Sequence, residues 1–341
     1  MSTAAFRPVE TSPVKALVYT APGELTYRDE AEPVIDDGDA LLRIDAVGIC
    51  GSDMHAYHGH DPRRNPPLVL GHELVGTVIE GANVGRRVTA NPLIACGRCD
   101  YCAEGRDNLC SRRAMVGMTR PGAYAERMSI PERCLIDLPD TLSTRAAALT
   151  EPAATALHAI AVAARALHRP LPEANTLVIG GGAVGMLAAL LLRSHGCRVT
   201  LAEPNALRRE SARHHAGCTV YDSRAAEPAA RAYGFVVDAV GAKVTRAAAM
   251  QAVAPGGVVL HIGLQDWASE IDMRKLTLDE ITLIGTYTYT MADLRATVSA
   301  LDRGVFGDLA WVEERRLADG AGAFRDLDAG ASAAAKIVLT P

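Results

Sequence analysis

The apolar residues of the chain follow two different patterns, which meet near residue 150. Before that point, short apolar and β-branched runs at 15–20, 40–47 and 68–79 are separated by Gly and Pro, with little helical spacing. Such runs predict strands, and a series of them predicts a barrel-like, all-β unit. Residues 152–166 are rich in Ala and carry apolar positions at helical spacing, so we expect a helix there.

Strands and helices are expected to alternate in the part of the chain that follows. Short apolar runs at 176–180, 198–203, 235–240 and 258–262 predict strands, and the stretches at 183–194, 206–216 and 244–253 predict helices. Alternation of helices with apolar strands is typical of a parallel, doubly wound sheet. The predicted fold class is therefore α/β together with a β-rich unit.

The tail after residue 284 is expected to carry one helix, about 291–303, and a last strand near 336–339. We expect this tail to return to the β-rich unit. That unit would then be discontinuous, formed by 14–153 and 290–341, with the doubly wound unit formed by 154–289. Residues 1–13 are expected to be a flexible extension.

Composition and charge narrow the function classes. The chain has 341 residues, a formal net charge of −5 and 49% apolar residues, which is enough for about two domains. No apolar run is long enough to span a bilayer, the first residues lack a signal-peptide pattern, and there is no basic stripe. We therefore expect a small-molecule substrate, with neither nucleic acid nor a membrane as partner.

Four of the eight cysteines form a compact motif. Cys96, Cys99 and Cys102 are spaced by two residues each, and Cys110 follows after seven more. Four thiolates at this spacing can surround a tetrahedral Zn²⁺ and leave no open position, which is typical of a structural zinc site. The alternative is four free or disulfide-bonded cysteines. Thiolates need a reducing compartment, so we expect a cytoplasmic protein, in which Cys134, Cys197 and Cys218 are buried thiols.

A second set of possible ligands lies upstream. Cys50, Ser52, Asp53 and His55 fall within six residues, and the triplet Gly71-His72-Glu73 follows. A mixed, dispersed set of this kind suits a metal ion with an open position for chemistry. One structural and one catalytic zinc in a single chain is a narrow signature.

A glycine-rich sequence marks a dinucleotide site between the strand at 176–180 and the helix at 183–194. Gly180, Gly182 and Gly185 fall at the fingerprint positions, with Ala183 and Val184 between the last two. This pattern brings the pyrophosphate of a dinucleotide to the N-terminus of the helix. Glu203 lies about 20 residues on, where a carboxylate accepts the adenosine-ribose hydroxyls and repels a 2′-phosphate, which favours NAD. Arg208 and Arg209 follow it, either as solvated residues or as contacts of adenine or a phosphate.

With these motifs the chain resembles the zinc-dependent medium-chain dehydrogenase/reductase superfamily over nearly its whole length. The resemblance implies a GroES-like catalytic domain, a Rossmann domain and an active site between them. It is nearest to the polyol branch, which includes sorbitol, galactitol-phosphate and threonine dehydrogenases. The reason is that Gly71-His72-Glu73 occurs together with Glu151-Pro152, where simple alcohol dehydrogenases carry a cysteine in place of Glu151.

The resemblance also implies roles for individual residues. Cys50, His72 and Glu73 would bind the catalytic zinc, and Glu151 would either bind it directly or hold its water. Glu151 could instead only cap the helix that follows it. Three further residues match family positions: Ser52 and His55 the proton relay, and Thr155 a site beside the nicotinamide. Asp53 would orient a ligand or a relay group.

The expected reaction is the reversible oxidation of a secondary hydroxyl group of a polyol to a ketone, with hydride transfer to NAD. Two zinc ions per chain and a homodimer or homotetramer are implied. A threonine or simple secondary-alcohol dehydrogenase is the alternative enzyme, and a non-catalytic zinc- and NAD(H)-binding sensor is the alternative outside enzymes. One departure concerns the substrate: sorbitol dehydrogenases carry an aromatic-Arg-Tyr motif where this chain has Tyr287-Thr288-Tyr289.

Overall fold

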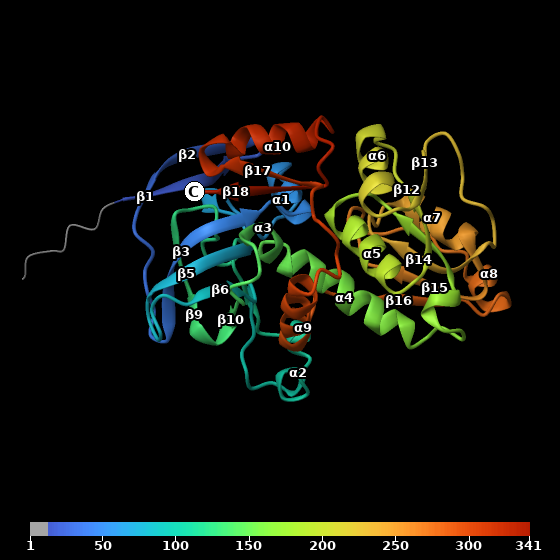
Figure 1. Ribbon diagram of the computed structural model, residues 1–341, viewed down its shortest axis with the longest axis horizontal. Helices are drawn as coiled ribbons and strands as arrows, with labels where there is room; N and C mark the ends of the chain where they lie inside the picture. Colours follow the sequence, from blue (N-terminus) through green and yellow to red (C-terminus); the bar gives the residue numbers. More distant parts are fainter. Residues whose placement is uncertain (1–12) are drawn as a thin grey trace, which may run out of the picture.

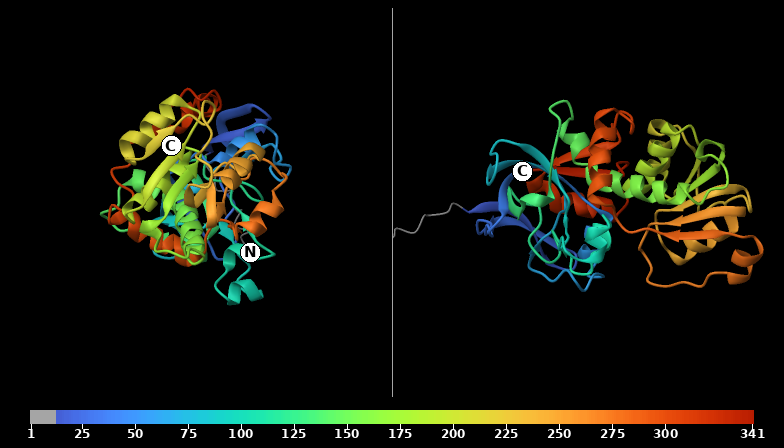
Figure 2. Two further views of the ribbon diagram at one scale, coloured as in Figure 1. Left: turned by 90° about the vertical axis from the view of Figure 1, so that its right-hand side faces the viewer. Right: turned by 90° about the horizontal axis from the view of Figure 1, so that it is seen from below.

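The structure is a computed structural model that describes residues 13–341. Apart from Pro13, the predicted extension lies outside these residues. Two bodies that each contain a large sheet lie side by side, and α4 (Thr150–Ala164) runs between them (Figures 1 and 2). Among the described residues, no helix is both long enough and apolar enough to cross a membrane.

The first body contains a seven-stranded sheet and a three-stranded sheet. The larger sheet has the strand order β10 (Leu135–Asp137), β6 (Arg87–Ala90), β5 (Glu73–Glu80), β3 (Asp39–Gly48), β18 (Lys336–Thr340) and β17 (Val312–Arg316), with β9 (Arg127–Pro131) also paired to β3. The smaller sheet has the order β2 (Glu24–Glu30), β1 (Val14–Ala21) and β4 (Leu68–Val69).

Helices and a small two-stranded sheet complete this body. The helices are α1 (Gly51–Tyr57), α2 (Asp100–Ala103), α3 (Thr144–Ala147), α9 (Met291–Asp302) and α10 (Gly320–Asp328). The strands β7 (Leu93–Ile94) and β8 (Ala114–Met115) pair with each other, and a 3₁₀ turn, η1 (Asp107–Leu109), precedes Cys110. Strand β18 pairs with β3, so the C-terminal tail does return to the β-rich body (Figure 1). The exact boundaries at 153 and 290 stay a prediction.

The second body is a six-stranded parallel sheet flanked by helices. Its order is β13 (Thr219–Tyr221), β12 (Arg198–Ala202), β11 (Asn175–Ile179), β14 (Tyr233–Asp238), β15 (Val253–His261) and β16 (Thr282–Gly285). Its helices are α5 (Ala183–Ser194), α6 (Ala206–His215), α7 (Lys243–Ala252) and α8 (Met273–Leu278). The chain order reverses on either side of β11, and ligands of doubly wound sheets bind at such a switch point. The predicted combination of a β-rich unit with a doubly wound sheet is confirmed.

Three local features differ from the expectations. The expected strand 68–79 is broken into β4 and β5, because the carbonyls of Val69, Leu70 and Gly71 accept hydrogen bonds from the amides of 122–124. Helix α1 was not expected, since seven residues are too few to show helical spacing. The tail also carries β17 and α10. The sequence of β17, Val-Glu-Glu-Arg-Arg, has only one apolar residue and becomes a strand through its pairing with β18.

Candidate metal centres and dinucleotide site

The four cysteines of the predicted structural site come together. Their sulfur atoms all lie within 4.8 Å of one another, and none of them is in a disulfide. The short helix α2 starts after Cys99, and η1 ends just before Cys110, so the two turns fold the cysteines around one point. The backbone N–H of Cys96 donates to the sulfur of Cys110 at 3.3 Å. Four thiol groups in this arrangement fit a closed, tetrahedral zinc site.

Cys50, His72 and Glu73 form the second group, with one ligand atom from each lying within 4.8 Å of the others. Cys50 lies between β3 and α1, and Glu73 is the first residue of β5. Glu73 is paired in register with Gly48, the last residue of β3. A Cβ atom on Gly48 would overlap the Glu73 carboxylate, so only glycine leaves room for this side chain.

Buried partners orient His72. Its Nδ1 atom lies 3.4 Å from Oδ1 of Asp53, which leaves Nε2 as the other nitrogen able to bind a metal. Tyr124 donates its hydroxyl to Oδ2 of Asp53 at 2.7 Å, and the N–H of Cys50 donates to the same oxygen at 3.2 Å. Burial would raise the pKa of Asp53, but the charges of His72 and Arg64 outweigh it and hold that pKa well below its usual range. A ligating histidine backed by a carboxylate is the usual arrangement around zinc.

Lys336 is a partner of this group that the sequence analysis missed. Its Nζ atom donates to Oε1 and Oε2 of Glu73 at 2.6 and 2.5 Å, and to the carbonyl of Ile49 at 2.6 Å. Both charged side chains are fully buried. The only signal in the sequence is a lysine at the start of an otherwise apolar strand. A metal ion bound here would share the Glu73 carboxylate with Lys336.

Glu151 lies beside the group but does not belong to it. It is in the first turn of α4, and its Oε1 atom accepts a hydrogen bond from the hydroxyl of Tyr289 at 2.5 Å. Burial raises the pKa of Glu151, and the charge of Glu73 adds to the effect. Burial and the Glu151 carboxylate likewise raise the pKa of Tyr289 well above its ordinary value, so this tyrosine stays a donor. This position favours a Glu151 that holds water or substrate over one that binds the metal directly.

The predicted relay residues lie on α1, where Ser52 and His55 are three residues apart and share a face. Arg64, which is buried, donates to the Ser52 hydroxyl at 3.2 Å and to its carbonyl at 2.9 Å. Arg64 also pairs with the buried Asp61. Burial lowers the pKa of His55, and the neighbouring His60 lowers it further, so the imidazole is neutral near pH 7. The sequence analysis missed Arg64.

The glycine loop has the shape that a dinucleotide requires. It joins β11 to α5, and Gly182 precedes the helix without a side chain that caps its N–H groups. Gly185 packs so closely on the carbonyl of Gly180 that any Cβ atom would overlap it. The next residues, Ala183 and Val184, form the first turn of α5. Free amides at a helix N-terminus fit a pyrophosphate.

Glu203 follows β12 and faces this loop. Its two carboxylate oxygens accept the N–H groups of Gly181 at 2.7 Å and Asn205 at 2.8 Å. Arg209 donates to the carbonyls of Glu203 and Pro204, both at 2.8 Å, so it has a structural role. The Nε atom of Arg208, in contrast, is buried without a hydrogen-bond partner among residues 13–341. Arg208 is therefore the arginine left for a ligand.

Two features lie apart from these contacts. Thr155 lies one turn after Glu151 on α4 and is half-buried, so both side chains share one face of the helix.

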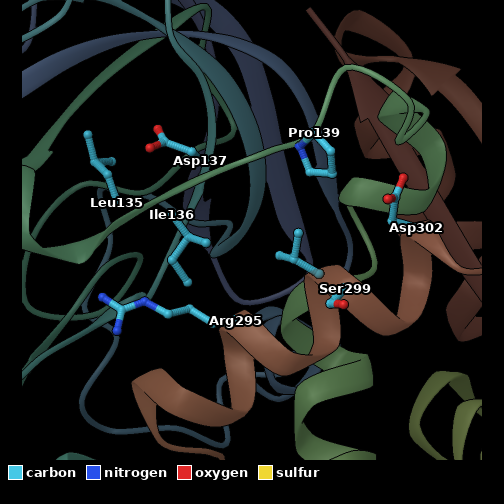
Figure 3. A pocket seen from close by; sticks show the side chains of 8 residues that line it. Leu135, Ile136, Asp137, Pro139, Arg295, Ser299 and Asp302 are labelled. Atoms are coloured by element: carbon cyan, nitrogen blue, oxygen red, sulfur yellow. The ribbon is translucent and has the colours of Figure 1, made fainter.

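A separate pocket lies between β10 and α9, where side chains of Ile136, Asp137 and Arg295 line it (Figure 3). None of its lining residues belongs to either cysteine-containing group or to the glycine loop. The roles of the predicted site residues stay predictions.

The chain matches two dehydrogenase family models and is similar to proteins named as dehydrogenases. Residues 36–140 match the family model of the alcohol dehydrogenase GroES-like domain, and residues 183–303 match that of the zinc-binding dehydrogenases. The chain is 31% identical to an L-galactonate-5-dehydrogenase of Escherichia coli (strain K12) over 296 residues, which are 83% of this chain and 85% of that protein. It is 31% identical to an L-threonine 3-dehydrogenase of Sinorhizobium fredii (strain NBRC 101917 / NGR234) over 336 residues, 93% of this chain and 94% of that one. An acetophenone reductase from Geotrichum candidum NBRC 4597, solved in complex with NAD, is 28% identical with a TM-score of 0.85, over 98% of this chain and 99% of that one.

Proposed function

Since the chain belongs to the zinc-dependent medium-chain dehydrogenase/reductase superfamily, in its polyol dehydrogenase-like branch, we propose that it oxidises a secondary hydroxyl group of a polyol or sugar alcohol to a ketone, with NAD as hydride acceptor. The observation that carries this proposal is the group Cys50, His72 and Glu73. Three protein ligands of mixed type leave a position for substrate. A sensor that only binds zinc and NAD(H) has no need of such a position.

The residues around the group have separate roles in the proposed reaction. Bound zinc supplies a Lewis acid that makes a coordinated hydroxyl group more acidic, and NAD supplies the hydride acceptor. Arg64 donates into one lone pair of the Ser52 hydroxyl. The second lone pair is then left to accept the proton of the substrate hydroxyl, and the Ser52 proton is left to pass on. His55, neutral on the same face of α1, is the next acceptor.

Glu151 selects a substrate with a second hydroxyl group. Three carboxylates lie in or beside the metal group. Asp53 faces His72, and Glu73 is occupied by Lys336, whereas Glu151 receives only Tyr289, on Oε1, among the described residues. Its Oε2 atom is therefore the acceptor left for a neighbouring hydroxyl. A buried acceptor that goes unpaired penalises analogues that lack the hydroxyl. This supports polyols over simple secondary alcohols.

NAD is the proposed coenzyme because of Glu203. Each of its oxygens already accepts one backbone amide and keeps a lone pair for a ribose hydroxyl. The 2′-phosphate of NADP would meet this buried carboxylate, and juxtaposed like charges cost several kcal/mol.

The test is a spectrophotometric screen for NADH formation with zinc-loaded protein over sugar alcohols, their phosphates, threonine, butanediol and ethanol. We expect turnover with a polyol and none with the His72→Ala variant. Equal or better kcat/KM with ethanol or simple 2-alkanols than with every polyol would overturn the proposal.

A second candidate substrate class, the sugar acids, is favoured by an arginine beside Tyr287. The guanidinium carbon of Arg113 lies 4.8 Å from the ring centroid of Tyr287. The chain thus has Thr288 in the motif position where sorbitol dehydrogenases carry arginine, but brings another arginine to the same segment. Adding aldonates to the NADH screen tests this class.

We also propose that two or four copies of the chain associate in a reducing compartment such as the cytoplasm. Strand β16 is an edge of the parallel sheet as described over residues 13–341. The loop and helix before it expose Trp267, Met273 and Leu278, and Trp267 is 92% exposed. An unpaired edge beside exposed apolar side chains supports self-association. Light scattering during size-exclusion chromatography measures the state, and a monomer at micromolar concentration would contradict it.

A further inference from the structure

The four-cysteine lobe, defined here as residues 95–113, holds a segment of the chain that is far away in sequence. Asn108 donates its side-chain N–H to the carbonyl of Tyr287 at 2.8 Å, across 179 positions. Asp107 accepts the backbone N–H of Met291 at 3.3 Å. Arg113 lies against the ring of Tyr287. The lobe therefore holds both ends of segment 287–291, which connects β16 to α9.

This segment leads directly to the proposed active site. Tyr289 is fully buried, and its hydroxyl is the donor to Glu151. Only Thr288 separates it from the carbonyl that Asn108 holds. If that carbonyl moved, the backbone of Thr288 would rotate, and the side chain of Tyr289 would point in a different direction.

Thr288 itself is held in an unfavourable conformation. Its φ angle is 47°, in the left-handed region that β-branched residues rarely adopt. Its hydroxyl oxygen is buried without a hydrogen-bond partner in the described part of the chain. A residue stays in such a conformation only where its surroundings enforce it. The contacts from Asp107 and Asn108 on either side are surroundings of that kind.

We propose that the four-cysteine lobe positions the substrate wall of the active site, with Asn108 as a positioning residue for Tyr289 and Glu151. Asn108 lies two residues before Cys110, so the fold that gathers the cysteines also sets its place. The neighbouring Asp107 accepts the side-chain N–H of Asn91 at 3.4 Å. Asn91 in turn accepts the N–H of Leu93, so Asp107 is linked to the start of β7. The consequence for turnover rests on the proposed function, whereas the mechanical link rests on these contacts alone.

The link is tested by hydrogen exchange of intact, zinc-loaded protein. Asn108→Leu keeps the size of the side chain and removes its donor. We expect the amides of 286–291 to exchange about tenfold faster than in wild type, as for one lost buried hydrogen bond, while those of β11 stay unchanged. Arg106→Ala is the matched control, because Arg106 lies in the same lobe and its exposed side chain contacts Glu104 and the ring of Tyr101, both within the lobe and apart from segment 287–291. Wild-type protection of 286–291 in the folded Asn108→Leu protein would overturn the proposal.

A kinetic measurement separates positioning from mere stabilisation. With sorbitol and galactonate as probes and NAD as coenzyme, kcat/KM of Asn108→Leu should fall about tenfold, with both zinc ions retained and the Arg106→Ala control unchanged. Unchanged kcat/KM despite faster exchange would overturn the positioning role. If wild type turns over neither probe, the best substrate of the NADH screen replaces them; if that screen finds no substrate, the proposed function is at fault, and exchange remains the test of the link. Asn108→Ser, which removes less bulk, serves if Asn108→Leu does not fold.

Discussion

The side chain of Lys336 changes the charge at the candidate catalytic metal site. It places a buried positive charge on the carboxylate of Glu73, which is one of three candidate ligands. A fully buried ion pair contributes little net stability, yet loss of one partner is costly because it leaves an uncompensated charge. Zinc bound to Glu73 would supply part of the missing charge.

Replacing Lys336 by Met should therefore destabilise the protein in a zinc-dependent way. We expect a loss of about 3–5 kcal/mol when the catalytic site lacks zinc, and a smaller loss when it is filled. Urea unfolding at increasing zinc concentration measures both values. Lys243→Met is the control, because Lys243 is exposed. An equal loss at all zinc concentrations would show that Glu73 is not a zinc ligand.

Replacing Glu203 by Ala should narrow the preference for NAD over NADP. Loss of the carboxylate removes the acceptor of the ribose hydroxyls and the repulsion of a 2′-phosphate. We expect the ratio of kcat/KM for NAD to that for NADP to fall about tenfold or more. Glu210→Ala, an exposed residue of α6 paired with Arg213, is the control. If wild type already has the higher kcat/KM with NADP, attraction of the 2′-phosphate by Arg208 exceeds its repulsion by Glu203.

At the scale of elements, the pairing of β3 with β5 builds the catalytic group. It places Gly48 opposite Glu73, while Cys50 and His72 leave the two strands at the same end. The group therefore depends on the register of this pair, because a slip of one residue would turn Glu73 to the other face.

A Gly48→Ala substitution should expel Glu73 from the group. The added Cβ would overlap its carboxylate, so the catalytic zinc should be lost and turnover abolished while the four-cysteine site stays filled. Metal analysis and NADH formation measure the two effects. Gly234→Ala in β14 is the matched control, since its nearest neighbour would lie 3.9 Å away. A fully active, two-zinc Gly48→Ala protein would contradict this geometry.

Whether a feature is local or joins distant elements explains what could be predicted from the sequence. The cysteine motif and the glycine loop are local patterns, so each could be recognised together with the turn or helix that contains it. The Lys336–Glu73 pair joins residues 263 positions apart, and the Tyr289–Glu151 bond joins residues 138 apart. Such contacts depend on which strands pair and where the chain crosses between bodies. The sequence therefore predicted the two cysteine-containing groups but missed Lys336, Arg64 and the contact between Asn108 and Tyr287.

At the scale of the whole molecule, the two zinc sites have different donors and different roles. Removing a ligand from one site should lower stability, and removing a ligand from the other should abolish turnover. Cys99→Ser removes a ligand of the closed site and should mainly lower the melting temperature, because structural zinc binding contributes to folding free energy. His72→Ala should abolish turnover with a smaller change in melting temperature than Cys99→Ser, because Tyr124 and the N–H of Cys50 still donate to the Asp53 carboxylate. Calorimetry and NADH formation on both variants test this division. It fails if Cys99→Ser keeps the wild-type melting temperature, or if His72→Ala stays active.

The most direct test of the account is a zinc titration of metal-depleted, refolded protein in which bound zinc per chain and NADH formation with a polyol substrate are measured together. Thiolates bind zinc more tightly than a carboxylate-containing set, so the four-cysteine site should fill first. We predict almost no turnover up to one zinc per chain, then a rise to full activity between one and two. Full turnover at one zinc per chain would contradict the assignment of a separate catalytic zinc to Cys50, His72 and Glu73.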